Sequence, residues 1–281
     1  MSASRRPIWS RVLAAAVVLA VLLLFGGRVF DFLGRQMLYP APAFAVPSPP
    51  PVPLEEVRLE LGSGGGEVIG WAFEHPPDAE RDRPRTAVVF FHGNGENLAT
   101  MQLAGLYDDF ERLGVHFLAV DYPGYGRSRG TPSEASLVAA GEAGLAWLER
   151  RFPDSPKAVA GWSLGAAVAV QVARRQGGRV ERLVLLSAWD DLTSLAAAHF
   201  PRWLVSMGLP DRYDSLAAAP EIAAPTLMIH GTRDQIIPIV HGERLYAAFG
   251  ERARMVRVPD AGHNDLLARP VVWEELARFL R

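Results

Sequence analysis

Residues 157–169 read Lys-Ala-Val-Ala-Gly-Trp-Ser-Leu-Gly-Ala-Ala-Val-Ala. A short apolar run leads into the pattern Gly-x-Ser-x-Gly at 161–165, and small residues follow, which predicts a strand, a tight turn and a helix. The glycines let the strand and the helix pack closely, so the turn should raise the Ser163 hydroxyl above the sheet edge. The alternative is an ordinary glycine turn with a chance serine, and the strand and helix around this one argue against it.

A serine hydroxyl is a poor nucleophile unless a base takes its proton. His263 follows Asp260-Ala261-Gly262 in a loop after the last predicted strand, where its imidazole would hang over Ser163. Asp234 follows another buried strand, and a carboxylate there would hold the imidazole in the required tautomer. We therefore expect Ser163 as nucleophile, His263 as base and Asp234 as acid.

Two other acidic residues compete with Asp234 for that role. Asp190 and Asp191 follow the preceding predicted strand and would also reach a base above the same turn. Asp234 could instead cap the helix that starts near Pro238. We favour Asp234 as the acid, because its loop is short and a helix follows at once.

Cleavage of an acyl group also needs N–H donors for the developing oxyanion. The backbone N–H of Leu164, directly after Ser163, is one expected donor. The second should come from His92-Gly93-Asn94-Gly95, which follows an apolar strand, and we expect it to be the N–H of Asn94. His92 and His230 each precede a glycine at a strand end, and we interpret both as structural.

Strand and helix patterns alternate along the rest of the chain, which predicts a mostly parallel sheet with helices on both faces. Residues 57–61 and 68–73 flank a glycine-rich turn and should form an antiparallel hairpin at the N-terminal edge. Further strands are expected at 86–91, 115–120, 158–160, 183–187, 226–230 and 254–258. Helices are expected at 97–113, from Thr131 to Arg151, at 164–175, from near Pro238, and at 271–280.

Residues 189–225 interrupt this alternation, since they contain helical pieces but no clear strand. We interpret them as a small helical lid. Large apolar side chains there suit an acyl-chain pocket, although they could equally pack the lid onto the domain. The candidate pocket residues are Trp162, Trp189, Phe200 and Trp203.

The N-terminus has an apolar run from Val12 to Phe25, preceded by Arg5, Arg6 and Arg11. Counted from Ile8 to Gly27 it holds twenty residues, about the length that spans a bilayer. We interpret residues 1–35 as an uncleaved signal anchor, with a cleaved secretory signal as the alternative. The arginines predict a single-pass membrane protein with its catalytic domain on the non-cytoplasmic side; after cleavage it would be secreted.

Residues 36–53 are rich in proline, which favours polyproline II and a semi-rigid stalk. Residues 54–281 then form the folded domain, including the lid.

Composition excludes other classes of function. The net charge of −2 gives no basic face for nucleic acid. The sequence has no Cys and no His-Glu-x-x-His, so we expect no metal and no cofactor.

Residues 54–281 resemble the α/β-hydrolase superfamily, most closely its membrane-anchored members with small lids. The resemblance rests on the Gly-x-Ser-x-Gly pattern, on Gly262-His263 and on four further motifs. These are Phe91-His92-Gly93-Asn94, Asp121-Tyr122-Pro123-Gly124-Tyr125-Gly126, Arg212-Tyr213-Asp214-Ser215 and Ile229-His230-Gly231-Thr232-Arg233-Asp234. Similar proteins include depalmitoylases and lysophospholipase or monoacylglycerol-lipase-like enzymes, so the resemblance implies the α/β-hydrolase fold and ester or thioester hydrolysis through an acyl-enzyme. The pair Asp190-Asp191 beside the lid departs from the family pattern.

The sequence thus predicts a serine hydrolase that acts on a small-molecule or lipid ester, with no nucleic-acid partner. Two alternatives stay open. A serine peptidase would use the same three residues, and a non-catalytic, membrane-tethered binding protein could share the fold.

Overall fold

The computed structural model describes residues 34–62, 66–76, 84–205, 209 and 211–281. Two compact units make up the chain, residues 1–39 and residues 40–281. In the first, residues 34–38 are helical; the rest of the predicted anchor, residues 1–33, lies outside the described residues. No helix within the described ranges is long and apolar enough to span a bilayer.

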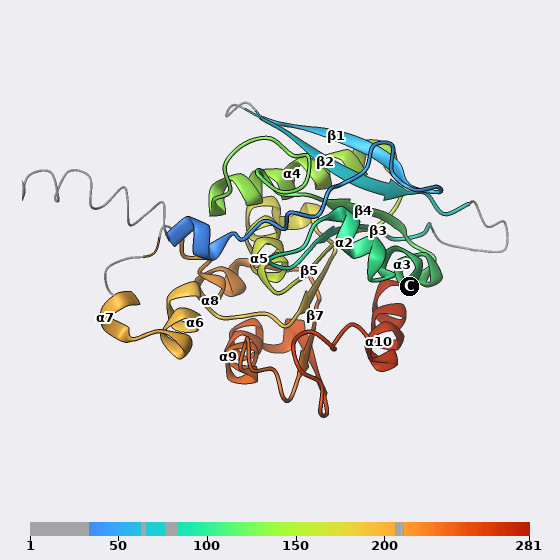
Figure 1. Cartoon of the computed structure of the whole chain (residues 1–281). Coiled ribbons are helices and arrows are strands. Elements are labelled where there is room, and N and C mark those ends of the chain that lie inside the picture. Colours follow the sequence, from blue (N-terminus) through green and yellow to red (C-terminus); the bar gives the residue numbers. More distant parts are fainter. Residues whose placement is uncertain (1–33, 63–65, 77–83, 206–208, 210) are drawn as a thin grey trace, which may run out of the picture. The chain divides into compact units, whose positions relative to one another are not determined.

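The second unit is built on an eight-stranded sheet in the order β1-β2-β4-β3-β5-β6-β7-β8 (Figure 1). Strands β1 and β2 pair antiparallel with each other, β2 pairs antiparallel with β4, and the other neighbours run parallel. This confirms the predicted mostly parallel sheet with an antiparallel N-terminal edge. The strands are β1 Glu55–Leu61, β2 Gly66–Phe73, β3 Ala87–Phe91, β4 His116–Val120, β5 Lys157–Trp162, β6 Arg182–Leu186, β7 Thr226–Gly231 and β8 Ala253–Val258.

Helices cover both faces of the sheet, because each central strand is apolar on both sides. Helix α3 packs against α10, while α4 packs against α5, which also contacts α8, and α8 contacts α9 (Figure 1). The helices are α2 Leu98–Leu103, α3 Leu106–Leu113, α4 Glu134–Arg151, α5 Leu164–Gln176, α6 Leu192–His199, α7 Arg202–Val205, α8 Ser215–Ala218, α9 Ile239–Phe249 and α10 Pro270–Leu280. Short 3₁₀ turns are η1 Gly177–Arg179, η2 Ala219–Glu221 and η3 Gly250–Arg252.

Between β6 and β7 the described residues form α6, α7, α8 and η2 and no strand. This is the segment interpreted as a lid. The proline-rich residues 40–53 belong to the second unit, where the side-chain amide of Asn97 donates to the Phe44 carbonyl at 2.7 Å.

Two helix predictions are wrong in detail. The single helix expected over residues 97–113 is two helices, because Gly105 adopts a left-handed φ of 75° that ends α2 and starts α3. The helix expected to start at Thr131 starts at Glu134, since Ser133 is the N-cap and its hydroxyl accepts the N–H of Ser136.

Candidate active site

The turn between β5 and α5 holds Ser163 in a strained backbone conformation, with φ 56° and ψ −118°. The Ser163 N–H donates to the carbonyl of Leu186 on the neighbouring strand β6 at 2.9 Å, which fixes the turn at the sheet edge. A Cβ on Gly161 would collide with the backbone of Gly165. A Cβ on Gly165 would likewise collide with the backbone of Phe91 on β3, so close packing requires both glycines.

Three predicted residues from distant parts of the chain meet at this turn. The His263 Nε2 lies 3.0 Å from the Ser163 Oγ, and its Nδ1 lies 2.8 Å from the Asp234 Oδ2. Ser163, Asp234 and His263 are 8%, 6% and 7% exposed. This is the distance and order of contacts in which an imidazole can take a proton from a hydroxyl while a carboxylate orients it.

The second oxygen of Asp234 is also engaged. Its Oδ1 accepts the backbone N–H groups of Ile236 at 3.0 Å and Ile237 at 2.7 Å. Burial opposes ionisation of this carboxyl, but the hydrogen bonds from His263 and Ile237 outweigh it, and the pKa of Asp234 lies below its ordinary value. Asp234 is therefore a fixed carboxylate facing the imidazole.

The competing acids face other partners. The Asp190 Oδ1 lies 2.6 Å from the His241 Nδ1, and its Oδ2 lies 2.7 Å from an Arg244 nitrogen. Asp191 is the N-cap of α6, where its side chain accepts the N–H of Ser194 at 2.9 Å. The geometry thus pairs His263 with Asp234.

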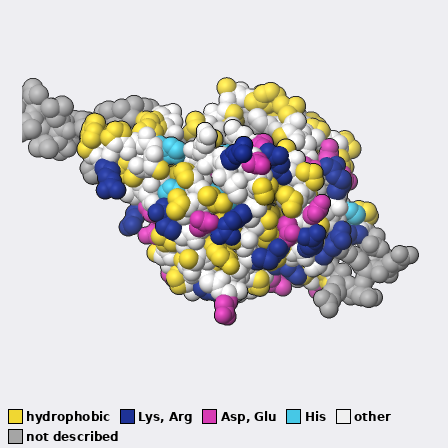
Figure 2. Space-filling view, turned by 90° about the horizontal axis from the view of Figure 1, so that it is seen from below, with side chains coloured by type: hydrophobic (Ala, Val, Ile, Leu, Met, Phe, Trp, Pro, Cys, Tyr) yellow, Lys and Arg dark blue, Asp and Glu magenta, His cyan; other side chains and the backbone are white. Residues whose placement is uncertain are grey.

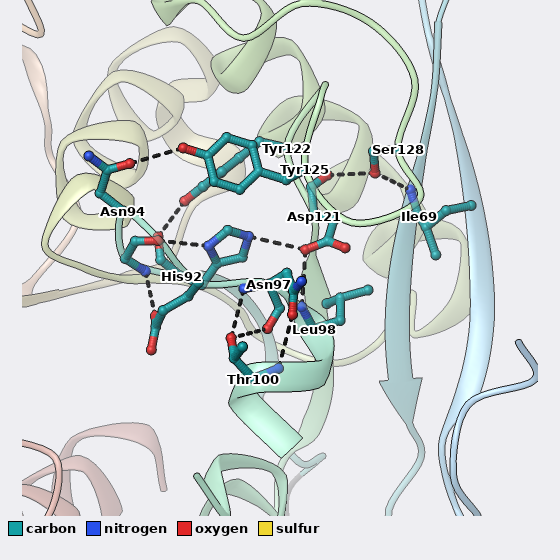
Figure 3. A network of polar contacts seen from close by, with 12 residues as sticks. Ile69, His92, Asn94, Asn97, Leu98, Thr100, Asp121, Tyr122, Tyr125 and Ser128 are labelled. Carbon is teal, nitrogen blue, oxygen red and sulfur yellow. Dashed lines mark hydrogen bonds and ion pairs between the residues drawn. The ribbon is translucent and has the colours of Figure 1, made fainter. Parts of the chain in front are cut away.

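The loop after β3 lies within a polar network (Figure 3). The Gly93 N–H donates to the Glu96 Oε2 at 2.8 Å, and the Tyr125 hydroxyl donates to the Asn94 Oδ1 at 2.9 Å. The His92 carbonyl accepts the Tyr122 hydroxyl at 2.7 Å. These bonds fix the loop whose Asn94 N–H was predicted as an oxyanion donor, while Leu164 is the first residue of α5.

Asp121 and Ser128 hold this network to the sheet. The Asp121 Oδ1 accepts the N–H of Leu98 at the start of α2 at 3.0 Å and lies 3.3 Å from the His92 Nε2. The Ser128 hydroxyl donates to the Asp121 carbonyl at 3.1 Å and accepts the Ile69 N–H at 2.9 Å. Figure 3 shows both contacts beside β2. His92 and Ser128 thus both help to fix the loops at the strand ends.

The candidate pocket residues lie in different places. Trp162 stacks on the His263 ring, with centroids 5.1 Å apart. Trp189 is buried edge-on to Tyr213, with centroids 6.4 Å apart. Phe200 and Trp203 are 43% and 68% exposed on the lid. Only Trp162 among these four is in ring contact with a residue of the Ser–His–Asp cluster in the described part of the chain.

Glu96 is a site residue that the sequence reasoning missed. It is half-buried, it fixes the Gly93 N–H, and burial raises the pKa of its carboxyl while His92, the Gly93 N–H and His263 lower it only in part. The available signal was an acid three residues after a glycine at a strand end. No group of three or more His, Asp or Glu side chains among the described residues is arranged to hold a metal ion.

This fold, with a Ser–His–Asp cluster at the strand ends, defines an α/β-hydrolase. The profile of the serine aminopeptidase family S33 matches residues 82–213, and that of the TAP-like proteins matches residues 205–281. An uncharacterized protein of Mycobacterium tuberculosis is 34% identical over 281 residues, which cover 95% of each chain. The chain therefore belongs to the α/β-hydrolase superfamily.

Two further proteins are similar to this chain. The alpha/beta hydrolase domain-containing protein aho-3 of Caenorhabditis elegans is 32% identical over 195 residues, 69% of this chain and 57% of that protein. The structure of the Pyrococcus furiosus esterase Pf2001 superposes with a TM-score of 0.66 at 20% identity, over 85% of this chain and 98% of the esterase. At that identity the likeness supports the fold alone.

Proposed function

We propose that this protein is a serine hydrolase that cleaves carboxylic esters or thioesters through an acyl-enzyme. The observation that carries the proposal is the continuous series of contacts from Ser163 through His263 to Asp234 at the strained turn. A structural serine needs neither a buried imidazole at 3.0 Å nor a strained backbone.

In the first half of the reaction, the Ser163 Oγ bonds to the acyl carbon while its proton passes to the His263 Nε2. The N–H groups of Leu164 and Asn94 stabilise the negative charge on the carbonyl oxygen. The bond to the leaving group then breaks, and the imidazolium returns the proton to that group. Asp234 holds the imidazole in place and stabilises its charged form.

In the second half, water takes the place of the leaving group. His263 removes a proton from the water as it attacks the acyl carbon. The bond between that carbon and the Ser163 Oγ then breaks, the imidazolium gives its proton to the Oγ, and the acid product leaves. The apolar lid residues and a membrane tether both favour acyl or lipid substrates over small polar ones.

Residues 1–35 are proposed to anchor this domain to the non-cytoplasmic face of a membrane, based on the apolar run behind three arginines. Carbonate extraction of the full chain from its host membranes tests the anchor, and protease accessibility in intact cells tests the side. Release of the chain by carbonate would overturn the anchor. Protection of the domain from external protease would overturn its placement on the non-cytoplasmic side.

A serine peptidase is the second candidate, favoured by the match to the serine aminopeptidase family over residues 82–213. A serine peptidase uses the same nucleophile and base as an esterase, so substitutions at Ser163 and His263 do not distinguish the two activities. A panel of p-nitrophenyl esters, an acyl thioester and an aminoacyl p-nitroanilide does. Faster turnover of the anilide than of any ester would favour the peptidase.

Fluorophosphonate labelling of the full chain tests the nucleophile itself. We expect the wild type to label and Ser163→Ala and His263→Ala not to label, with Arg175→Glu on the exposed end of α5 as the control that labels normally. If the folded wild type does not react with the probe, or if Ser163→Ala is labelled, the catalytic proposal is wrong. A non-catalytic binding protein would then be the favoured function.

A further inference from the structure

A hollow lies on the molecule apart from the Ser–His–Asp cluster. It has a volume of about 680 Å³ and opens between α6, α7 and α9, and neither Ser163 nor His263 lines it. That volume is within the range of about 300–1,000 Å³ in which proteins bind small molecules. One wall is apolar and is made by Ala197, Ala198, Val205 and Val240.

The other wall carries a preorganised cation. The buried Asp190 carboxylate holds both His241, at 2.6 Å, and Arg244, at 2.7 Å, so the guanidinium is fixed at the edge of the hollow. Arg244 also donates to the Ser194 hydroxyl at 3.2 Å. Burial opposes ionisation of Asp190, but the His241 hydrogen bond and Arg244 help to hold its pKa below the ordinary value.

The Asp190 carboxylate on this wall is already used as an acceptor. Asp190 is bound by two side chains and by the Asp191 N–H, and Asp191 accepts the N–H of Ser194. Arg202 lines the hollow and makes no ion pair within the described part of the chain. Because Asp190 already offsets Arg244, Arg202 is the cation with which a ligand's negative charge can pair.

Figure 2 shows the mixed character of this end of the molecule, where hydrophobic and arginine side chains lie together at the left of the view, near α6 and α7. An apolar wall facing guanidinium groups suits a molecule with an alkyl chain and a small planar anion. The fork of N–H donors on a guanidinium matches the two oxygens of a carboxylate.

We propose that the hollow between α6, α7 and α9 binds an amphiphilic monocarboxylate, whose carboxylate contacts Arg202 and Arg244 and whose alkyl chain lies along Ala197, Ala198 and Val240. The site is distinct from the catalytic one and does not depend on catalysis at Ser163. The ligand can be a fatty acid from the surroundings or the acid released at Ser163, since both carry the same groups.

Equilibrium dialysis of radiolabelled octanoate tests the proposal. The sample is the full chain in lipid nanodiscs, and empty nanodiscs are the blank. Octanoate should bind saturably to the wild type and equally to Ser163→Ala, which cannot turn over. Arg202→Glu should weaken binding about tenfold or more and Arg202→Lys much less. The matched charge reversal Arg175→Glu, at an exposed arginine outside the hollow, should have no effect.

Several results would overturn the proposal. One is the absence of saturable octanoate binding. Another is equal octanoate binding by Arg202→Glu and the wild type, in samples with the same thermal unfolding. A third is binding of octyltrimethylammonium that equals the binding of octanoate. Tighter binding of octyl phosphate would reassign the site to phosphate-headed lipids. Loss of catalysis appears as loss of turnover, whereas loss of this site appears as loss of octanoate binding. The comparison with Ser163→Ala therefore separates the two. Turnover of an ester substrate by the wild type should also lower the binding of octanoate if the released acid fills the hollow. Ser163→Ala releases no acid, so its octanoate binding should then stay unchanged.

Discussion

Gly165 on α5 lies directly against the backbone of Phe91 on β3, so closely that a Cβ atom at Gly165 would fall well inside 3.0 Å of the Phe91 carbonyl oxygen. Neither backbone can yield without separating the helix from the central strand. Gly165→Ala should therefore destabilise the domain by about 3 kcal/mol, the upper end of ordinary overpacking. Urea denaturation of the full chain measures the difference.

Gly178 in η1 provides the matched control. A Cβ there meets no atom within 4 Å, so Gly178→Ala should leave the midpoint almost unchanged. Equal denaturation midpoints for the two variants would mean that the strand and the helix can separate without cost, which contradicts the tight turn.

The sequence predicted the Ser163 turn well because its constraints are local. A strand, a glycine on each side of the serine and a small-residue helix specify one backbone path, and close packing excludes the alternatives. The parallel sheet followed from the same locality, since apolar runs such as 86–91 are typical of strands covered on both faces. The predicted strand directions, mostly parallel with an antiparallel N-terminal edge, were confirmed.

What the sequence could not provide depends on contacts between distant residues. Asp190 and Asp234 both follow buried strands, and only the positions of His241 and His263 separate their roles. Gly105 breaks a helix whose apolar pattern is continuous, because the pattern carries no information about a left-handed φ. Glu96 was missed since its partner is a backbone N–H, and an acid three residues after a glycine does not by itself specify that contact.

Asp234→Asn should lower kcat by about 10⁴-fold, the scale for replacing the orienting carboxylate of such a triad, because an amide favours the wrong tautomer of His263. Turnover of a p-nitrophenyl ester, or the rate of fluorophosphonate labelling, measures the loss. The control is Asp260→Asn, which removes an exposed carboxylate paired with Arg233 in the loop before His263. Normal turnover by Asp234→Asn would assign the orienting role to Asp190 instead.

Glu96 should make the domain less stable as the pH rises. Burial raises the pKa of its carboxyl, so the folded state holds the proton more strongly than the unfolded state. That stability is fully present below the unfolded pKa, near 4.5, and is lost as the pH rises through the higher folded pKa. Glu96→Gln keeps an acceptor for the Gly93 N–H without the charge.

The measurement compares the free energy of unfolding of Glu96→Gln with that of the wild type from pH 4 to pH 8. The difference should shift in favour of the glutamine as the pH rises. Glu60→Gln in the exposed part of β1 makes the same charge change away from the site and corrects for the general effect. A difference that is constant with pH, or that shifts toward the wild type, would contradict the raised pKa.

Glu134 at the start of α4 should stabilise the connection that leads into α8 within the lid. Its Oε2 accepts the N–H groups of Arg212 at 2.9 Å and Tyr213 at 3.0 Å, and its own N–H donates to Asp211 at 3.0 Å. Tyr213 is fully buried with a positive φ of 44°, so this backbone has no easy alternative conformation. Glu134→Ala should therefore cost about 2 kcal/mol through the N–H groups left without an acceptor.

Glu149→Ala on the same helix is the control, since it removes a carboxylate that pairs with Arg179 at the surface, where such pairs contribute about 1 kcal/mol or less. Glu134→Gln, which keeps one acceptor oxygen, should fall between Glu134→Ala and the wild type in urea denaturation. Hydrogen exchange at the Tyr213 amide should accelerate in Glu134→Ala and not in Glu149→Ala. If both alanine variants lose the same stability, Glu134 acts only as a surface charge. The connection would then be held by the burial of Tyr213 alone, because that side chain stays packed against Trp189 in either variant.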